Sequence, residues 1–328
     1  MAQKDKTVAR VLVIQTAFLG DALLTLPLIR RLQEAFPSAE VHWLLRKGNE
    51  ELFEQHPWKF RLWTWDKSWR DFLRLYRELS QLEWEGIIVV QRFFRMGLLG
   101  WLLKARWRIA YDKSPLSFLY THAVPHEVRE GVHETTRVLA LLRPLGFSPT
   151  LPPPPWLFPS ELPFFKKPYI VVAPASRWAT KEAPLEYWAR FLQQVPLTYH
   201  VYLTADASQW AKLEKLTAFH PKVENVAGKL SLREVAALVA GAERLYTVDS
   251  ALTHFGSALN VPTTTIYCST LPAFGFGPLA PGSEVVETPL PLACRPCGIH
   301  GRRTCPLSHF QCGHTLPLPQ MREKYPLR

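Results

Sequence analysis

The stretch Tyr246–Thr263, YTVDSALTHFGSALNVPT, joins a β-like run to a helical pattern and decides the fold class of this chain. The β-like part ends at Asp249 and Ser250, and the apolar residues Ala251 and Phe255 begin the helical pattern. Asp and Ser are both favourable helix caps. The free N–H groups and the positive dipole end of such a helix favour a phosphate group. The junction therefore predicts an α/β protein with an anion site, although an ordinary capped helix would produce the same pattern.

Length and composition predict two domains. The chain has 328 residues, of which 47% are hydrophobic, so it exceeds one ordinary core and has enough apolar residues for two. It contains no uncharged apolar run long enough to span a membrane. The first fifteen residues, MAQKDKTVARVLVIQ, lack the apolar stretch of a signal peptide. We therefore expect the protein in the cytoplasm.

The net charge of +11 favours partners that carry phosphate. Nucleic acid, anionic lipid and nucleotide-sugars all belong to this class, and the charge alone does not choose among them. The sequence has no Walker phosphate loop, no zinc-finger spacing and no RNA-binding aromatic signature. We therefore expect no nucleic-acid partner.

Strand-like runs alternate with helical patterns in both halves of the chain. This alternation predicts two parallel sheets covered by helices, with ligands in a cleft between the domains at the carboxyl ends of the strands. A proline-rich linker, residues 151–168, separates an N-terminal domain, residues 1–150, from a C-terminal domain, residues 169–328. The strand-like runs are Val11–Gln15, Glu40–Leu45, Gly86–Val90, Ile170–Ala173, His200–Thr204, Arg244–Val248 and Thr263–Tyr267.

A carboxylate follows the first predicted strand in the segment LGDALLTLPLIRRL. Gly20 is suited to a tight turn with close backbone approach, and Asp21 lies where the next helix begins. We expect Asp21 at the mouth of the cleft. The alternative interpretation is that Asp21 is only a helix cap.

The second domain repeats this layout in VVAPASRWATKEAP. A strand leads into a loop that carries Ser176, Arg177, Thr180 and Lys181, and a helix is predicted from about Leu185. Hydroxyl donors and cations gather in this loop, as a phosphate site requires, although a solvated basic loop has the same composition.

Four segments together resemble glycosyltransferase family 9, the ADP-heptose:lipopolysaccharide heptosyltransferases. They are LGDALLTLPLIRRL, PASRWATKEAP, AGKLSLREVAALVAGAERLYTVDSALTHFGSALNVPT and the cysteine-rich CRPC…CPLSHFQC. Their order and spacing cover most of the chain, and the third segment is the most specific. The stretch from about Trp58 to Pro149 contributes least to the resemblance.

This resemblance implies a GT-B architecture, with an N-terminal acceptor-binding domain and a C-terminal domain that binds the nucleotide-sugar donor. It implies an inverting transfer of heptose from ADP-heptose to a lipid-linked lipopolysaccharide inner-core acceptor at the inner leaflet, without cofactor or metal. Asp21 falls on the position of the general base, and Lys181 on that of the cation at the donor diphosphate. The other donor-binding positions are Gly20, Ser176, Thr180, Asp249, Ser250, Ala251 and His254.

The residues are consistent with this chemistry. A single displacement needs a base for the acceptor hydroxyl and positive groups for the departing diphosphate. Asp21 supplies the first, and Lys181 with the helix that begins at Ala251 supplies the second. The sequence contains no Asp-x-Asp pair, the usual carboxylate clamp for a metal on a nucleotide-sugar.

Several positions around the donor depart from the family pattern. Ala251 replaces a usual Gly, Ala183 replaces a usual Trp, and residues 204–207, Thr-Ala-Asp-Ala, replace a Gly followed by an acid. A side chain at Ala251 narrows the approach of a phosphate. The sugar and the base of the donor are therefore less firmly specified than the reaction type.

The segment Gln91–Arg108 carries five basic residues, no acidic residue and a broad apolar face. Its composition favours a helix that covers the sheet after the strand Gly86–Val90. Contact with a membrane leaflet is the alternative, and a lipid-linked acceptor is compatible with both. We therefore expect a cytoplasmic protein that associates peripherally with the inner membrane.

Cys294, Cys297, Cys305 and Cys312 lie within nineteen residues with the spacing C-x2-C-x7-C-x6-C. Four thiols can bind zinc, but the spacing is irregular. Reduced structural thiols are the favoured interpretation, and disulfides the least favoured in the cytoplasm.

Three alternatives to heptose transfer stay open. The first is a transferase for a different nucleotide-sugar, and the second is a nucleotide-sugar-binding or lipid-binding protein without turnover. The third is a nicotinamide enzyme, because residues 275–280, GFGPLA, spell a dinucleotide fingerprint. Pro278 and Pro281 interrupt the helix that such a fingerprint requires, which makes the third alternative the weakest.

Overall fold

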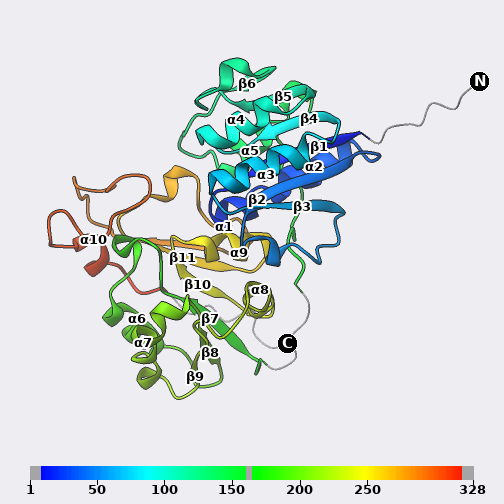
Figure 1. Cartoon of the computed structure of the whole chain (residues 1–328). Helices are drawn as coiled ribbons and strands as arrows, with labels where there is room; N and C mark the ends of the chain where they lie inside the picture. Colours follow the sequence, from blue (N-terminus) through cyan, green and yellow to red (C-terminus); the bar gives the residue numbers. More distant parts are fainter. Residues whose placement is uncertain (1–8, 160–164, 320–328) are drawn as a thin grey trace, which may run out of the picture. The chain divides into compact units, whose positions relative to one another are not determined.

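The computed structural model describes residues 9–159 and 165–319. The chain forms two compact units (Figure 1). The boundary lies between Pro153 and Pro154, except that the short stretch Arg129–Gly131 belongs to the second unit. Residues 160–164 of the predicted linker lie outside the described residues. Within the same linker, the backbone N–H groups of Trp156 and Leu157 donate to the carbonyl of Ala258 at 2.7 and 3.1 Å, and both side chains are buried in the second unit.

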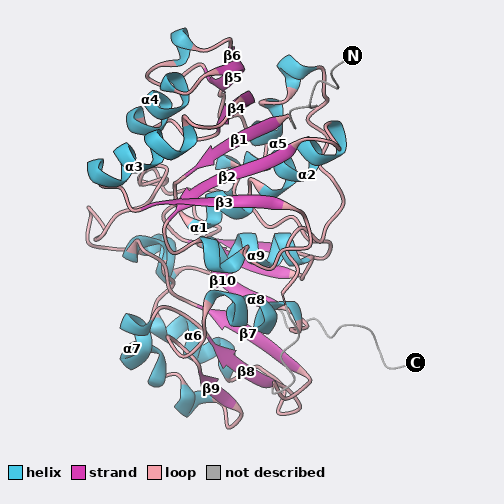
Figure 2. Cartoon of the chain, turned by 45° about the vertical axis from the view of Figure 1, so that its right-hand side comes forward, coloured by secondary structure: helices cyan, strands magenta, loops and turns pink. Residues whose placement is uncertain are grey.

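The first unit is built on a parallel six-stranded sheet with the order β3-β2-β1-β4-β5-β6. Helices α3 and α4 cover one face of this sheet, and α2 and α5 cover the other (Figure 2). The strands are β1 Arg10–Gln15, β2 Glu40–Arg46, β3 Phe60–Trp65, β4 Trp84–Val89, β5 Ala105–Tyr111 and β6 His122–Val124. The helices are α1 Leu19–Leu23, α2 Leu26–Ala35, α3 Trp69–Leu79, α4 Phe94–Leu102 and α5 Glu134–Ala140.

The second unit repeats this design with the order β12-β11-β10-β7-β8-β9, again all parallel. Its strands are β7 Tyr169–Ala173, β8 His200–Leu203, β9 Val223–Asn225, β10 Leu245–Val248, β11 Thr263–Tyr267 and β12 Glu284–Glu287. Its helices are α6 Leu185–Leu192, α7 Trp210–Glu214, α8 Leu232–Ala240, α9 Ala251–Leu259 and α10 Gln311–His314. The predicted α/β class with two parallel sheets is confirmed.

The central strands are buried on both sides, and this explains their continuous apolar sequences. In β1 every residue from Val11 to Gln15 is buried, and all five residues of β7 are buried. Helix α9 lies close to β11 because Gly256 has no side chain at the contact. A Cβ at Gly256 would collide with the hydroxyl of Thr263.

Two predictions about local structure are wrong. The single helix predicted for Gln91–Arg108 is shorter, because α4 ends at Leu102 and strand β5 begins at Ala105. Parallel pairing of β5 with β4 marks the strand. Gly20 does not form a turn: it lies within α1 and is not among the described glycines with positive φ. The turn lies before it, at residues 16–18.

Candidate active site

Each sheet has one place where the winding direction reverses. In the first unit it lies between β1 and β4, and in the second between β7 and β10. Ligands of open parallel sheets bind beyond the carboxyl ends of the strands at this reversal. The loops that follow these four strands are therefore the candidate sites, and they contain most of the predicted site residues.

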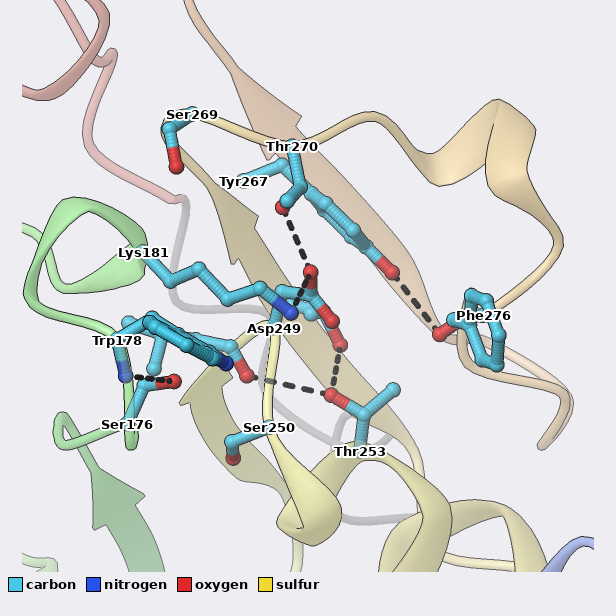
Figure 3. Close-up of polar contacts among 12 residues, drawn as sticks. Ser176, Trp178, Lys181, Asp249, Ser250, Thr253, Tyr267, Ser269, Thr270 and Phe276 are labelled. Atoms are coloured by element: carbon cyan, nitrogen blue, oxygen red, sulfur yellow. Dashed lines mark hydrogen bonds and ion pairs between the residues drawn. The ribbon is translucent and has the colours of Figure 1, made fainter. Parts of the chain in front are cut away.

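In the second unit, Lys181 and Asp249 meet at this position. Lys181 ends the 3-10 turn Ala179–Lys181 after β7, and Asp249 follows β10. The Lys181 Nζ lies 2.7 Å from the Asp249 Oδ2, and the two side chains are only 13% and 11% exposed. The Thr270 hydroxyl, after β11, donates to the same carboxylate oxygen at 2.6 Å. Three neighbouring loops thus converge on one carboxylate and one ammonium group (Figure 3).

Helix α9 begins beside this cluster (Figure 3). The Ser250 hydroxyl caps it and accepts from the backbone N–H of Leu252 at 3.3 Å, as predicted. Asp249 does not cap the helix, because its carboxylate is bonded to Lys181 and Thr270 instead. The N-terminal end of α9, which starts at Ala251, therefore lies next to a cation in the same group of loops.

Thr180 ties the cysteine-rich segment to the Lys181 turn. Its hydroxyl donates to the Arg302 carbonyl at 3.0 Å, and it accepts from the Arg302 N–H at 2.7 Å and from the Ser269 hydroxyl at 2.9 Å. Gly301, with φ +76°, packs against the Lys181 stem, where a Cβ would lie 3.0 Å from Lys181 Cγ. The backbone after Cys297 therefore supports the turn that presents Lys181.

Ser176 and His254 lie in the same unit. The Ser176 N–H donates to Glu182 Oε1 at 2.8 Å, and Glu182 also pairs with Lys212 at 2.6 Å. His254 is buried on α9, with its ring centroid 6.2 Å from that of Phe276. The donor-binding roles of both residues stay predictions.

In the first unit, Asp21 lies in α1 just beyond β1. Its Oδ2 accepts from the Phe18 N–H at 3.1 Å, so the carboxylate closes the first turn of the helix. Arg46 and Lys67 lie over the Phe18 ring at 5.8 and 5.7 Å from the centroid. Asp21 is half-buried, and the two cations lie over the ring of the residue whose N–H its carboxylate accepts. Its role as a base stays a prediction.

The loop before Asp21 is fixed to the loop after β4. Gln91 Oε1 accepts from the Thr16 N–H at 2.7 Å, and Gln91 Nε2 donates to the Thr16 hydroxyl at 2.8 Å. Both residues are buried. These bonds join the carboxyl ends of β1 and β4 and hold the backbone that leads to Asp21.

All five cysteines are free thiols, so the disulfide alternative has no support in the structure. Cys294, Cys297 and Cys305 line a cavity of about 290 Å³ with Arg302. Burial, together with the neighbouring Cys294 and Cys305, raises the pKa of Cys297. Within residues 9–159 and 165–319, no three His, Cys, Asp or Glu side chains are arranged to hold a metal ion.

Sequence reasoning did not identify Thr270, Ser269 or Arg302 as part of this site. Ser269 and Thr270 directly follow β11, so polar residues after a predicted strand were the available signal. Arg302 carried no such signal, because it contributes backbone groups to Thr180 rather than its charge.

Comparison with known proteins relates most of this chain to one family. A family model described as glycosyltransferase family 9 (heptosyltransferase) matches residues 72–304. The chain is 28% identical to lipopolysaccharide heptosyltransferase 1 of Pseudomonas aeruginosa, over 88% of this chain and 86% of that protein.

Two solved structures share the fold. The glycosyltransferase family 9 protein of Veillonella parvula aligns with a TM-score of 0.74 at 18% identity, over 85% of this chain and 86% of that one. The E. coli heptosyltransferase WaaC with ADP-2-deoxy-2-fluoro heptose aligns with a TM-score of 0.72 at 22% identity, over 85% and 93%.

A model described as thioredoxin matches residues 1–58. This stretch contains no cysteine, and thiol–disulfide exchange requires thiols. The match therefore gives no support for thiol–disulfide chemistry in this stretch. In addition, no helix among the described residues is long and apolar enough to cross a membrane.

Proposed function

The chain belongs to glycosyltransferase family 9, the heptosyltransferases, and we propose that it moves a heptose from ADP-heptose to an inner-core acceptor of lipopolysaccharide. The relatives support this substrate pair: one is named a lipopolysaccharide heptosyltransferase, and one solved neighbour holds an ADP-heptose analogue. The observation that carries the proposal is the convergence of Lys181, Asp249 and the start of α9 at the carboxyl ends of β7 and β10.

The donor diphosphate would bind to Lys181 and to the first N–H groups of α9. An ammonium group has three N–H donors, and Asp249 occupies one of them, so the others are available to phosphate oxygens. Asp249 would hold the ammonium group in place, and Thr270 would hold Asp249. Asp249 is therefore a positioning residue in this proposal, and the second unit is the donor-binding domain.

The acceptor would bind to the first unit. Its hydroxyl oxygen attacks the anomeric carbon of the heptose, the bond to the diphosphate breaks, and the hydroxyl proton passes to Asp21. The electron pair of the broken bond leaves with ADP, whose charge Lys181 and α9 stabilise. One displacement of this kind inverts the anomeric configuration. The cations Arg46 and Lys67 suit an acceptor that carries anionic groups.

A lipid-linked acceptor requires that the enzyme reaches the membrane surface. We therefore include peripheral association with the inner membrane, from the cytoplasmic side, in the proposal. A cleft between the two domains is likewise a prediction of the sequence and forms part of this proposal.

The test is a transfer assay with purified protein, ADP-heptose and a heptose-free lipopolysaccharide core. Mass spectrometry should show one added heptose, and NMR of the product should show the inverted anomer. A parallel thermal-shift series with other nucleotide-sugars distinguishes donors, since a hundredfold excess over the dissociation constant stabilises a protein by about 2.7 kcal/mol. If ADP-heptose stabilised the protein but no product formed, the chain would be a binding protein without turnover. If transfer occurred only from another nucleotide-sugar, that compound would be the donor in place of ADP-heptose.

A further inference from the structure

The outer surface of α3 and α4 exposes large apolar side chains. Trp69 and Leu73 lie one turn apart on α3, and Phe94 and Trp101 lie two turns apart on α4. Trp69 is 55% exposed, Phe94 is 50% exposed and Trp101 is 41% exposed. Phe93, just before α4, is 54% exposed. We call these five residues the α3–α4 face.

The two helices form one continuous surface. Arg95 of α4 lies over the Trp69 ring of α3, with its Cζ 5.5 Å from the ring centroid. The 3-10 turn Ser117–Leu119 adjoins α4, because the Tyr120 hydroxyl donates to the Gly97 carbonyl at 2.7 Å. Phe118 in this turn is 77% exposed and extends the apolar surface. The aromatic side chains of the face thus belong to elements in contact with one another.

Cations surround these aromatic side chains. Arg70, Arg77, Arg92 and Lys104 are exposed and form no ion pair among the residues that the structure describes. Helix α3 carries three arginines against two acids, and both acids, Asp71 and Glu78, pair with Arg74, at 2.6 and 2.8 Å. Between residues 91 and 108 the chain has five basic residues and no acidic one. The face therefore presents uncompensated positive charge around an apolar centre.

This combination suits one partner. Interfacial segments place aromatic and apolar side chains at the acyl boundary, and Lys and Arg at the phosphate groups. A protein partner would instead have to supply acidic groups matched to each of these cations, whereas an anionic leaflet offers negative charge over its whole surface. Helix α4 has nine residues, so at about 14 Å it is too short to cross the hydrocarbon core of a bilayer, which is about 30 Å thick, and it can lie on the surface of one leaflet.

We propose that the α3–α4 face is the membrane-docking surface of this enzyme, with an anionic lipid leaflet as its partner. The inference rests on the proposed function only in that the acceptor is lipid-linked. Docking itself requires neither donor nor turnover, and it can therefore be measured separately.

The experiment is flotation of the full chain with phosphatidylcholine vesicles and with vesicles that also contain phosphatidylglycerol. The wild type should float with the anionic vesicles and much less with the neutral ones. Arg92→Gln/Lys104→Gln should weaken binding to anionic vesicles roughly 25-fold, at roughly fivefold per cation removed. Phe94→Ser/Trp101→Ser should weaken it by a similar factor or more. Thermal unfolding confirms that each variant is folded.

Matched controls are Lys215→Gln and Leu197→Ser, which change an exposed cation and an exposed leucine of the second unit. Both should float like the wild type. Equal loss in the controls, equal binding to neutral vesicles, or no binding of the wild type overturns the inference. The inference is also overturned if a face variant binds vesicles normally and changes only the self-association measured by sedimentation, because the partner of the face is then a second copy of the chain.

A transfer assay on a detergent-free, delipidated core acceptor separates docking from catalysis. The face variants should retain wild-type turnover on this soluble acceptor and lose turnover on vesicle-embedded acceptor. Loss on the soluble acceptor overturns the inference, because the face would then bind the acceptor core. If vesicle binding is normal but the wild type transfers no heptose, the proposed function fails and the docking surface stands.

Discussion

Asp21 is the residue on which the proposed mechanism depends most directly. Asp21→Asn should preserve the hydrogen bond from the Phe18 N–H, since the amide oxygen also accepts. The free energy of unfolding should change by less than about 1 kcal/mol, because the substitution removes only a charge near a helix N-terminus. Heptose transfer should fall roughly a hundredfold to ten-thousandfold, the usual contribution of a positioned base. Single-turnover transfer assays measure this loss.

Asp71 provides the matched control for this substitution. It occupies the same place in the first turn of α3 and accepts from the Asp66 N–H at 2.9 Å. Asp71→Asn should therefore leave transfer near the wild-type rate. Near-normal turnover of Asp21→Asn would remove Asp21 from the mechanism and leave it as a helix cap.

Lys181 is expected to bind the donor through its charge. Lys181→Ala should weaken donor affinity about 10- to 150-fold, as one charge-assisted hydrogen bond contributes about 1.5–3 kcal/mol. Calorimetric titration with ADP-heptose measures this. Because the substitution also leaves Asp249 without its cation, the double variant Lys181→Ala/Asp249→Asn should recover stability but not affinity. If Lys181→Ala changed only the affinity for the acceptor, the Lys181 loop would bind the acceptor rather than the donor.

The pairing of Lys181 with Asp249 could not be predicted from the sequence. The sequence indicated each residue separately, because each follows a recognisable strand. Their contact depends on β7 and β10 being neighbours in the sheet, although two strands and three α-helices separate them along the chain. For the same reason Asp249 was assigned to the helix cap, a local role, when a distant partner competes for its carboxylate.

At the scale of elements, the loop that ends at Arg302 should control the Lys181 turn through Thr180. Thr180→Val removes a buried hydroxyl that makes three hydrogen bonds, so it should destabilise the fold by about 2–3 kcal/mol. Donor affinity should fall roughly tenfold, because the turn that presents Lys181 loses its support. Thermal unfolding and donor titration measure the two effects.

Thr180→Ser is the control, since it keeps the hydroxyl and loses only a methyl group. It should retain most of the stability and the donor affinity of the wild type. If Thr180→Val lowered stability and left donor affinity unchanged, the segment around Cys297 would have a structural role alone.

Seven of the inner strands were predictable from the sequence, whereas the four edge strands and the inner strand β5 were not. The runs that became β1, β2, β4, β7, β8, β10 and β11 are continuous and apolar, because these strands are buried on both faces. The flanking strands β3, β5, β6, β9 and β12 were missed. Residues such as Arg61 and Glu224 on these strands are exposed, and β6 and β9 have only three residues each. Mixed burial in short segments removes the hydrophobic pattern on which the prediction depends.

At the scale of the whole molecule, the repeated strand order places equivalent loops at the carboxyl edge of both sheets. Asp21 follows the first strand of one unit, and Lys181 follows the first strand of the other. The base and the cation of the proposed reaction thus occupy corresponding positions in two copies of one architecture. Alternation of strands and helices was sufficient to predict this arrangement, because it depends on the chain order of elements rather than on individual contacts.

We expect heptose transfer to be independent of metal, because the protein itself supplies positive charge to stabilise the departing ADP. Lys181 and the N-terminal end of α9 supply positive charge at one site, and the sequence contains no Asp-x-Asp pair. Transfer by the full chain should therefore survive exhaustive treatment with EDTA. Thermal unfolding must be measured alongside, because a metal held by Cys294, Cys297, Cys305 or Cys312 would be removed as well and its loop would loosen. Loss of transfer at an unchanged unfolding temperature, restored by Mg²⁺ or Mn²⁺, would show that a divalent ion stabilises the leaving group in place of Lys181.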